Sequence, residues 1–139
     1  MTRSPFESRT PDARNRGTRG PGGGRTWPEG LCRPGSPDFE RSAKAWLFDL
    51  APPRWRYEEV LHRHPLELAR MVVLFLEVEL TSIRARLLAT RHSPHPTVRE
   101  VSGVYRRECE WVATTVEQVK LVEAALSDTT GASFEAPRM

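Results

Sequence analysis

Residues 65–91 read PLELARMVVLFLEVELTSIRARLLATR and form the longest strongly apolar run in the chain of 139 residues. On a helix, its apolar side chains fall on one stripe with the i, i+3, i+4, i+7 spacing of a core-facing helix. The stripe consists of Ala69, Val72, Val73, Leu76, Leu80, Ile83 and Leu87. Pro65 suits the first helical position, where its missing N–H would have no partner in any case. We therefore predict one long helix over residues 65–91.

The first half of this run has a second apolar face, and the second half does not. That second face consists of Leu68, Met71, Phe75 and Val78. We therefore expect cover on two sides for the first half and on one side for the second. The longest unbroken apolar stretch, residues 71–76, is far shorter than the ~20 residues that a membrane span needs, so we expect no membrane association.

A second long helix is predicted over residues 98–127. Pro94 and Pro96 prevent it from continuing the first helix. Thr97 and Glu100 match a capping box, in which the hydroxyl and the carboxylate each accept a free N–H. The apolar stripe of this helix consists of Val101, Tyr105, Cys109, Val112, Val116, Val119, Val122 and Leu126. We expect the helix to end near Asp128 and residues 129–139 to form a frayed C-terminal tail.

The short loop between the two helices makes them antiparallel neighbours, so their stripes pair about a centre near residue 94. The expected pairs are Ala69–Val119, Val73–Val116, Leu76–Val112, Leu80–Cys109, Ile83–Tyr105 and Leu87–Val101. All the pairs are apolar, as in a helical hairpin of the coiled-coil kind. The predicted fold is therefore all-α, with an antiparallel two-helix hairpin at its centre.

Residues 41–64 are expected to form a helical cap on this hairpin. Ser42 is a candidate N-cap for a short helix that ends at Leu50, before Pro52 and Pro53. Another turn or two of helix should follow before Pro65. The segment is rich in aromatic side chains, which we expect to cover the second face of the long helix.

Residues 1–40 hold most of the glycines and few apolar side chains, so we expect a disordered N-terminal tail. The net charge of the chain is +3, and the arginines of residues 14–25 resemble Arg/Gly segments that bind RNA. The helical part, residues 41–128, is nearly neutral, which weakens any argument from charge to nucleic acid. A solvated flexible tail is the favoured interpretation, and weak phosphate binding is the alternative.

No pattern of catalytic, cofactor-binding or metal-ligating residues is present, so we expect a non-enzymatic protein without a cofactor or metal. The four histidines form two pairs, His62 with His64 and His92 with His95, at opposite ends of a helix roughly 40 Å long. One chain cannot bring the pairs together. No signal peptide is visible, which indicates a cytoplasmic protein with Cys32 and Cys109 reduced.

Two surfaces are candidates for binding. The first is a polar patch where the cap meets the long helix, made of Asp49, Arg54, Arg56, Arg63, His64 and Arg70. It is either a salt-bridge network that fixes the cap or a site for an anion or a partner. The second is an apolar flank of the second helix, made of Val104, Trp111 and Val122. Either the flank mediates self-association into a four-helix bundle, or residues 41–64 cover it.

A motif of the type WLxDxxPPxxR…VLxRHPxxLAR runs through residues 46–70, followed by a VxLVExAL run. Its residues are Trp46, Leu47, Asp49, Pro52, Pro53, Arg56, Val60, Leu61, Arg63, His64, Pro65, Leu68, Ala69, Arg70, Val119, Leu121, Val122, Glu123, Ala125 and Leu126. In this motif the chain resembles a group of small uncharacterised actinobacterial proteins. The resemblance implies an all-helical fold and a bacterial cytoplasmic setting, and it implies no activity.

The sequence therefore favours a protein–protein interaction or assembly module whose partner is another protein or a second copy, as in a homodimer. The alternative is a nucleic-acid-associated accessory protein that uses the Arg-rich tail. A third and weaker interpretation is a helical bundle that senses a metal through the histidine pairs.

Overall fold

The computed structural model describes residues 26–135, with side chains described for residues 26–130. In chain order the elements are α2 (Phe39–Leu50), the 3₁₀ helix η2 (Pro53–Tyr57), α3 (Glu59–Arg63), α4 (Pro65–Thr90) and α5 (Pro96–Glu135). No strand occurs in this described range. The prediction of an all-helical protein is confirmed.

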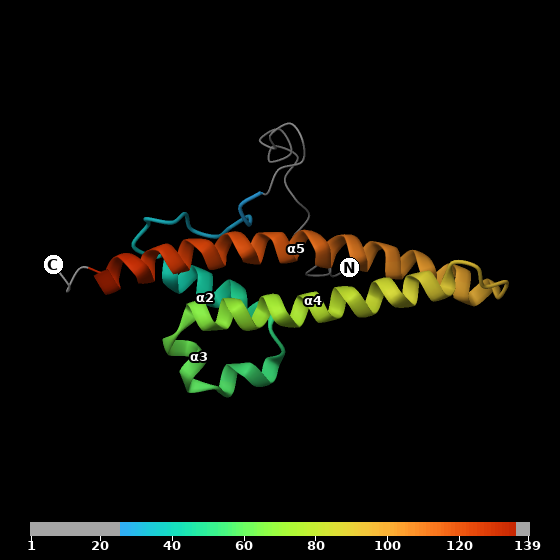
Figure 1. Cartoon of the computed structure of the whole chain (residues 1–139), viewed down its shortest axis with the longest axis horizontal. Coiled ribbons are helices and arrows are strands. Elements are labelled where there is room, and N and C mark those ends of the chain that lie inside the picture. The colour runs from blue at the N-terminus through green and yellow to red at the C-terminus, as the bar shows by residue number, and fades with distance from the viewer. Residues whose placement is uncertain (1–25, 136–139) are drawn as a thin grey trace, which may run out of the picture.

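The two long helices, α4 and α5, lie side by side and run in opposite directions, joined by the short loop of residues 91–95 (Figure 1). Pro65 is the first residue of α4, as its fixed backbone angle favours. The facing stripes supply much of the core. Buried members are Ala69, Val72, Val73, Leu76 and Leu80 on α4 and Val112, Val116, Val119, Val122 and Leu126 on α5.

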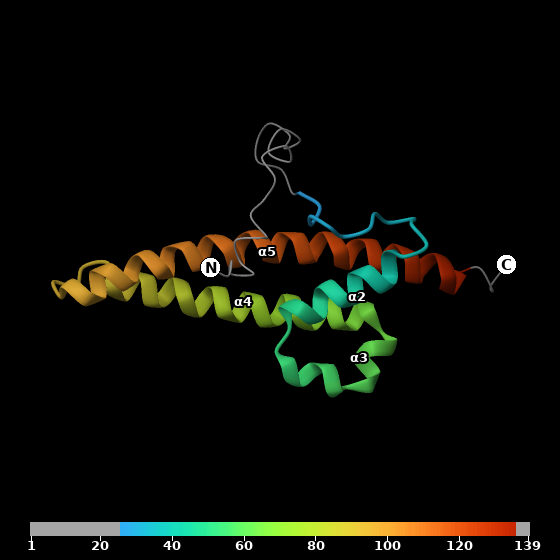
Figure 2. The same ribbon diagram turned by 180° about the vertical axis from the view of Figure 1, so that it is seen from behind.

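The helix α2 packs across the open side of this pair. It starts near the C-terminal part of α5 and ends against the middle of α4 (Figure 2). Its buried side chains are Phe39, Ala43, Leu47 and Phe48. Two prolines then stop the helix, and η2 and α3 return the chain to Pro65 on the side of α4 that faces away from α5 (Figures 1 and 2).

The cap covers less of α4 than the sequence predicts. Leu68 is fully buried, and the ring of Phe75 packs edge-on against Trp55 at a centroid distance of 5.9 Å. Met71 and Val78 remain exposed, so their predicted burial is wrong. These two side chains lie roughly 60–80° further round the helix from α5 than Leu68 does, on the side that α2 does not cover.

Residues 26–40 correct the predicted boundary of the disordered tail, because they are packed on the helices rather than free. Leu31 and Phe39 are buried, and Trp27 packs against Phe39 at a centroid distance of 5.9 Å. The helix α2 starts at Phe39, so Ser42 lies inside it and is not the N-cap. Residues 1–25, with the Arg-rich segment, lie outside the described residues.

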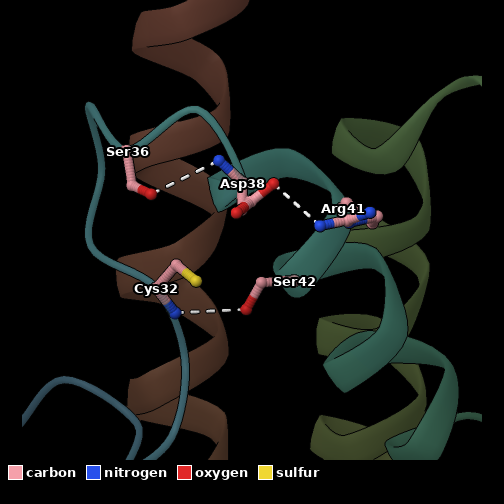
Figure 3. Close-up of polar contacts among 5 residues, drawn as sticks. All are labelled: Cys32, Ser36, Asp38, Arg41 and Ser42. Carbon is pink, nitrogen blue, oxygen red and sulfur yellow. Dashed lines mark hydrogen bonds and ion pairs between the residues drawn. The ribbon is translucent and has the colours of Figure 1, made fainter.

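Ser42 instead fastens the N-terminal segment to α2. Its hydroxyl oxygen accepts a hydrogen bond from the backbone N–H of Cys32 at 3.1 Å (Figure 3). Nearby, the N–H of Asp38 donates to the Ser36 hydroxyl at 3.3 Å, and the Asp38 carboxylate pairs with Arg41 at 2.8 Å (Figure 3). These contacts connect the N-terminal segment to the first turn of α2.

Both ends of α5 differ from the sequence prediction. The helix begins at Pro96, so Thr97 lies in its first turn and the predicted capping box is wrong. Proline suits that first position for the same reason as Pro65 does in α4. At the other end the backbone stays helical to Glu135 rather than fraying after Asp128, and Thr129 donates its hydroxyl to the carbonyl of Ala125 at 3.0 Å.

Candidate interaction surfaces

The predicted polar patch is not one cluster in the structure. Asp49 and Arg56 form one ion pair at 2.9 Å between α2 and η2. Arg70 belongs to another, with Glu67 at 2.8 Å and Glu123 of α5 at 3.5 Å. Arg63 and His64 lie at the corner between α3 and α4, beside a shallow hollow that also contains Glu40. Arg54 is exposed.

The pair of Asp49 and Arg56 belongs to a network that fixes the cap. The Arg56 guanidinium lies 5.9 Å from the centre of the Phe48 ring. His62 stacks on the same ring at 4.4 Å, and its Nε2 lies 2.7 Å from the carbonyl oxygen of Arg56. Lys44 donates to the carbonyl of His62 at 3.2 Å. The contacts of this part of the patch are therefore those of a structural network.

The predicted apolar flank is divided by the end of α2. Val104 and Trp111 are about half exposed, whereas Val122 is fully buried in the core. Val122 lies roughly 16 Å along the helix axis from Trp111, about the length of α2 itself. The helix α2 contacts α5, and Val122 belongs to the same buried cluster as Leu47 and Phe48 of α2, whereas Trp111 does not. Val122 therefore does not belong to an exposed flank.

Two glutamates lie beside the exposed part of this flank. Partial burial, together with the nearby carboxylate of Glu108, raises the pKa of Glu79 above its ordinary value. The two carboxylates come from facing helices, Glu79 from α4 and Glu108 from α5. The predicted pairing of Leu80 with Cys109 was the signal in the sequence for the proximity of these two carboxylates, which was not predicted. Arg107 is exposed on the same face, three residues after Val104 and four before Trp111, so the surface around Trp111 combines apolar, acidic and basic groups.

A second exposed apolar surface, which the sequence analysis missed, lies on the side of α4 that faces away from α5. Its large side chains are Met71, Leu74, Val78 and Leu88, with 36%, 64%, 67% and 60% of their area exposed. The 3.6-residue periodicity places them roughly half a turn from the stripe that packs on α5. Exposed apolar side chains repeated along one face of a helix are typical of a binding surface.

The described residues offer little for chemistry. They contain no group of three or more His, Cys, Asp or Glu side chains that could hold a metal ion. Within the same range, every buried side-chain nitrogen or oxygen has a hydrogen-bond partner. The hollow between α4 and α5 is lined by charged residues, and Lys120 pairs there with Glu77 at 3.3 Å and Glu117 at 3.7 Å. Cys32 and Cys109 are both free thiols.

No helix in the described part of the chain has the length and apolar character that crossing a membrane requires. Comparison with protein-family models, with curated proteins and with solved structures gave no match to this chain. The arguments for function therefore come from the surfaces just described.

Proposed function

We propose that this chain is a non-enzymatic protein–protein interaction or assembly module. Its scaffold is an antiparallel two-helix hairpin with a short helical cap, and its binding surface is the apolar area that the cap leaves uncovered. The observation that carries the proposal is the exposure of large apolar side chains on both long helices, most clearly Leu74 and Val78 of α4 and Trp111 of α5.

Several features support binding rather than catalysis. The exposed apolar side chains lie on long helices, whose rigid backbone holds them in place without the entropy loss of ordering a loop. Tryptophan is strongly enriched among the residues that dominate binding energy at protein interfaces. Glu108 and Arg107 lie within about one helical turn of Trp111, so a partner with charged side chains of both signs around an apolar centre would fit this surface.

The test is a comparison of the full-length chain with two surface variants, Leu74→Glu and Trp111→Glu, by sedimentation velocity and by capture of binding proteins from the native host. Both side chains are exposed, so both variants should fold, which circular dichroism checks. We expect at least one variant to lose self-association or a captured partner that the wild type binds. Wild-type protein that neither self-associates nor captures a partner would argue against the proposal.

The Arg-rich N-terminal segment supports the alternative, a nucleic-acid-associated accessory protein. Residues 1–25 carry six arginines and two acidic residues. Removal of these residues leaves Trp27 and Leu31 on the helices, so the deletion variant should keep its fold. Salt-sensitive binding of RNA or DNA that disappears on this deletion would favour the alternative. Association that survives the deletion would favour the interaction module.

A further inference from the structure

The helix α4 carries two apolar seams with the same spacing on opposite faces. The first is Ala69, Val73, Leu76, Leu80, Ile83 and Leu87, which faces α5. The second is Met71, Leu74, Val78, Thr81, Ala85 and Leu88, and all of its members are exposed. In both seams, steps of three and four residues alternate, which is the repeat of a coiled coil. The second seam therefore has the pattern of a helix–helix contact, but no helix of residues 26–135 packs on it.

We propose that this second seam pairs with the same seam of a second copy of the chain, in an antiparallel register centred between Glu79 and Leu80. The inference rests on the proposed function, because it names the partner of the interaction module. It makes α4 the shared inner helix of a dimer, with one α5 on each outer side.

The register matches large side chains with smaller ones. Leu74 comes opposite Ala85 of the second copy, and Val78 comes opposite Thr81 of the second copy. Met71 and Leu88 meet at the two ends of the seam. Thr81 already donates its hydroxyl to the carbonyl of Glu77 at 3.0 Å, so this hydroxyl keeps a partner in an otherwise apolar layer.

Charge complementarity selects the antiparallel arrangement. Glu77 and Arg84 flank the seam on the same edge, one heptad apart. In an antiparallel pair such equivalent edges face each other, so Glu77 faces Arg84 of the second copy, and the symmetry repeats the contact. Glu77 already pairs with Lys120 of its own chain at 3.3 Å, so Arg84 of the second copy would be its second cationic neighbour. In a parallel pair Glu77 would face Ser82, and no opposite charges would meet. Within the described part of the chain, Arg84 has no ion-pair partner.

The ends of the seam are compatible with this register. It brings Arg70 near Arg91 of the second copy, but Arg70 is already paired with Glu67 and Glu123 of its own chain. Glu67 itself comes opposite His92 of the second copy. The antiparallel arrangement also places the two caps at opposite ends of the pair, because η2 and α3 lie alongside the N-terminal half of α4 (Figures 1 and 2). A parallel arrangement would bring both caps to the same end.

The deciding experiment uses two single charge variants of the full chain, Arg84→Glu and Glu77→Arg, alone and mixed in equal amounts. In the proposed register each variant alone places like charges together at both symmetric contacts, which should raise the dimer Kd about tenfold. The mixture restores opposite charges at both contacts, so a mixed dimer should form with a Kd close to that of the wild type. Sedimentation velocity measures all of these values.

A second comparison separates this surface from the flank of α5. Leu74→Glu should raise the dimer Kd by about a hundredfold or more, because the symmetry buries two unpaired charges. Val104→Glu places the same charge on an apolar side chain of α5 that is also more than half exposed, and it should leave the Kd unchanged. Circular dichroism confirms that both variants are folded.

Three results would overturn the inference. They are a wild-type chain that is monomeric at every concentration tested, a mixture of the charge variants that associates no better than either alone, or a dimer weakened by Val104→Glu but not by Leu74→Glu. The third result would leave the proposed function standing, with the α5 flank as its surface. The proposed function itself would fail only if neither the second seam of α4 nor the flank of α5 bound any protein.

Discussion

Leu47→Ala should be among the most destabilising single substitutions in this protein. Leu47 lies in α2, has no exposed area and belongs to the central core cluster. Truncation of a fully buried leucine removes its transfer free energy and leaves a cavity, which together cost about 2–5 kcal/mol. For a domain of this size, a loss of about 3 kcal/mol corresponds to a fall in Tm of roughly 10–20 °C.

The matched control is Leu74→Ala, the same chemical change at a side chain that is 64% exposed. In dilute solution, where the chain is monomeric, it should cost less than about 0.5 kcal/mol. Urea unfolding followed by circular dichroism measures both variants, and the difference between their midpoints removes effects common to any loss of a leucine from a helix. Equal destabilisation by the two substitutions would refute the placement of α2 on the hairpin.

Three further predictions concern other contacts. Burial and the Glu108 carboxylate raise the pKa of Glu79 in the folded state above its ordinary value of 4.5, so the contribution of Glu79 to stability is present below pH 4.5 and is lost as pH rises through the folded-state pKa. The free energy of unfolding of the wild type, relative to that of Glu79→Gln, should therefore fall over this pH range in urea titrations at several pH values. Ser42→Ala removes the acceptor of the Cys32 N–H and should cost about 0.5–1.5 kcal/mol in urea unfolding, whereas Ser36→Ala, at a more exposed contact, should cost less. Deletion of residues 1–25 should leave the Tm unchanged, and deletion of residues 1–38 should lower it by several degrees, because only the longer deletion removes Leu31 from the core; equal Tm values would contradict this packing.

The long helices were predictable because their signals are local. The periodicity of residues 65–91 and the prolines around the loop determine where α4 starts and where it stops. The predicted end of α5 was wrong because a glycine such as Gly131 often follows the last turn of a helix, whereas here the helix continues through it to Glu135 and the next proline is Pro137. Helix boundaries predicted from such local patterns can therefore be wrong by a turn or more.

The N-terminal segment was missed because its order depends on tertiary contacts. Trp27 and Leu31 are isolated apolar residues in a segment rich in glycine and proline, which resembles a disordered tail. Their burial depends on a surface formed by α2 and α5, which no local pattern of the segment encodes. Phe39 was assigned to the tail for the same reason, although it begins α2.

The exposed surfaces were only partly predictable. The spacing of Met71, Leu74 and Val78 is visible in the sequence, but their exposure depends on where α2 ends and which side of α4 it covers. The position of α2 also explains why Val122 is buried. The sequence pattern grouped Val122 with Trp111 because both lie on one edge of the second helix. Position along the axis, rather than position on the helical wheel, separates them.

The helices α4 and α5 extend well past the end of α2, and their loop end contains few buried side chains. Between residues 81 and 111 the only buried side chain is that of Thr90, whereas residues 112–126 contribute six buried side chains from α5 alone. Amide protons near the loop should therefore exchange through local opening at a lower free energy than those beneath α2. A second copy bound along residues 71–88 would bridge the two regions. Slower amide exchange near the loop should then accompany a rise in protein concentration.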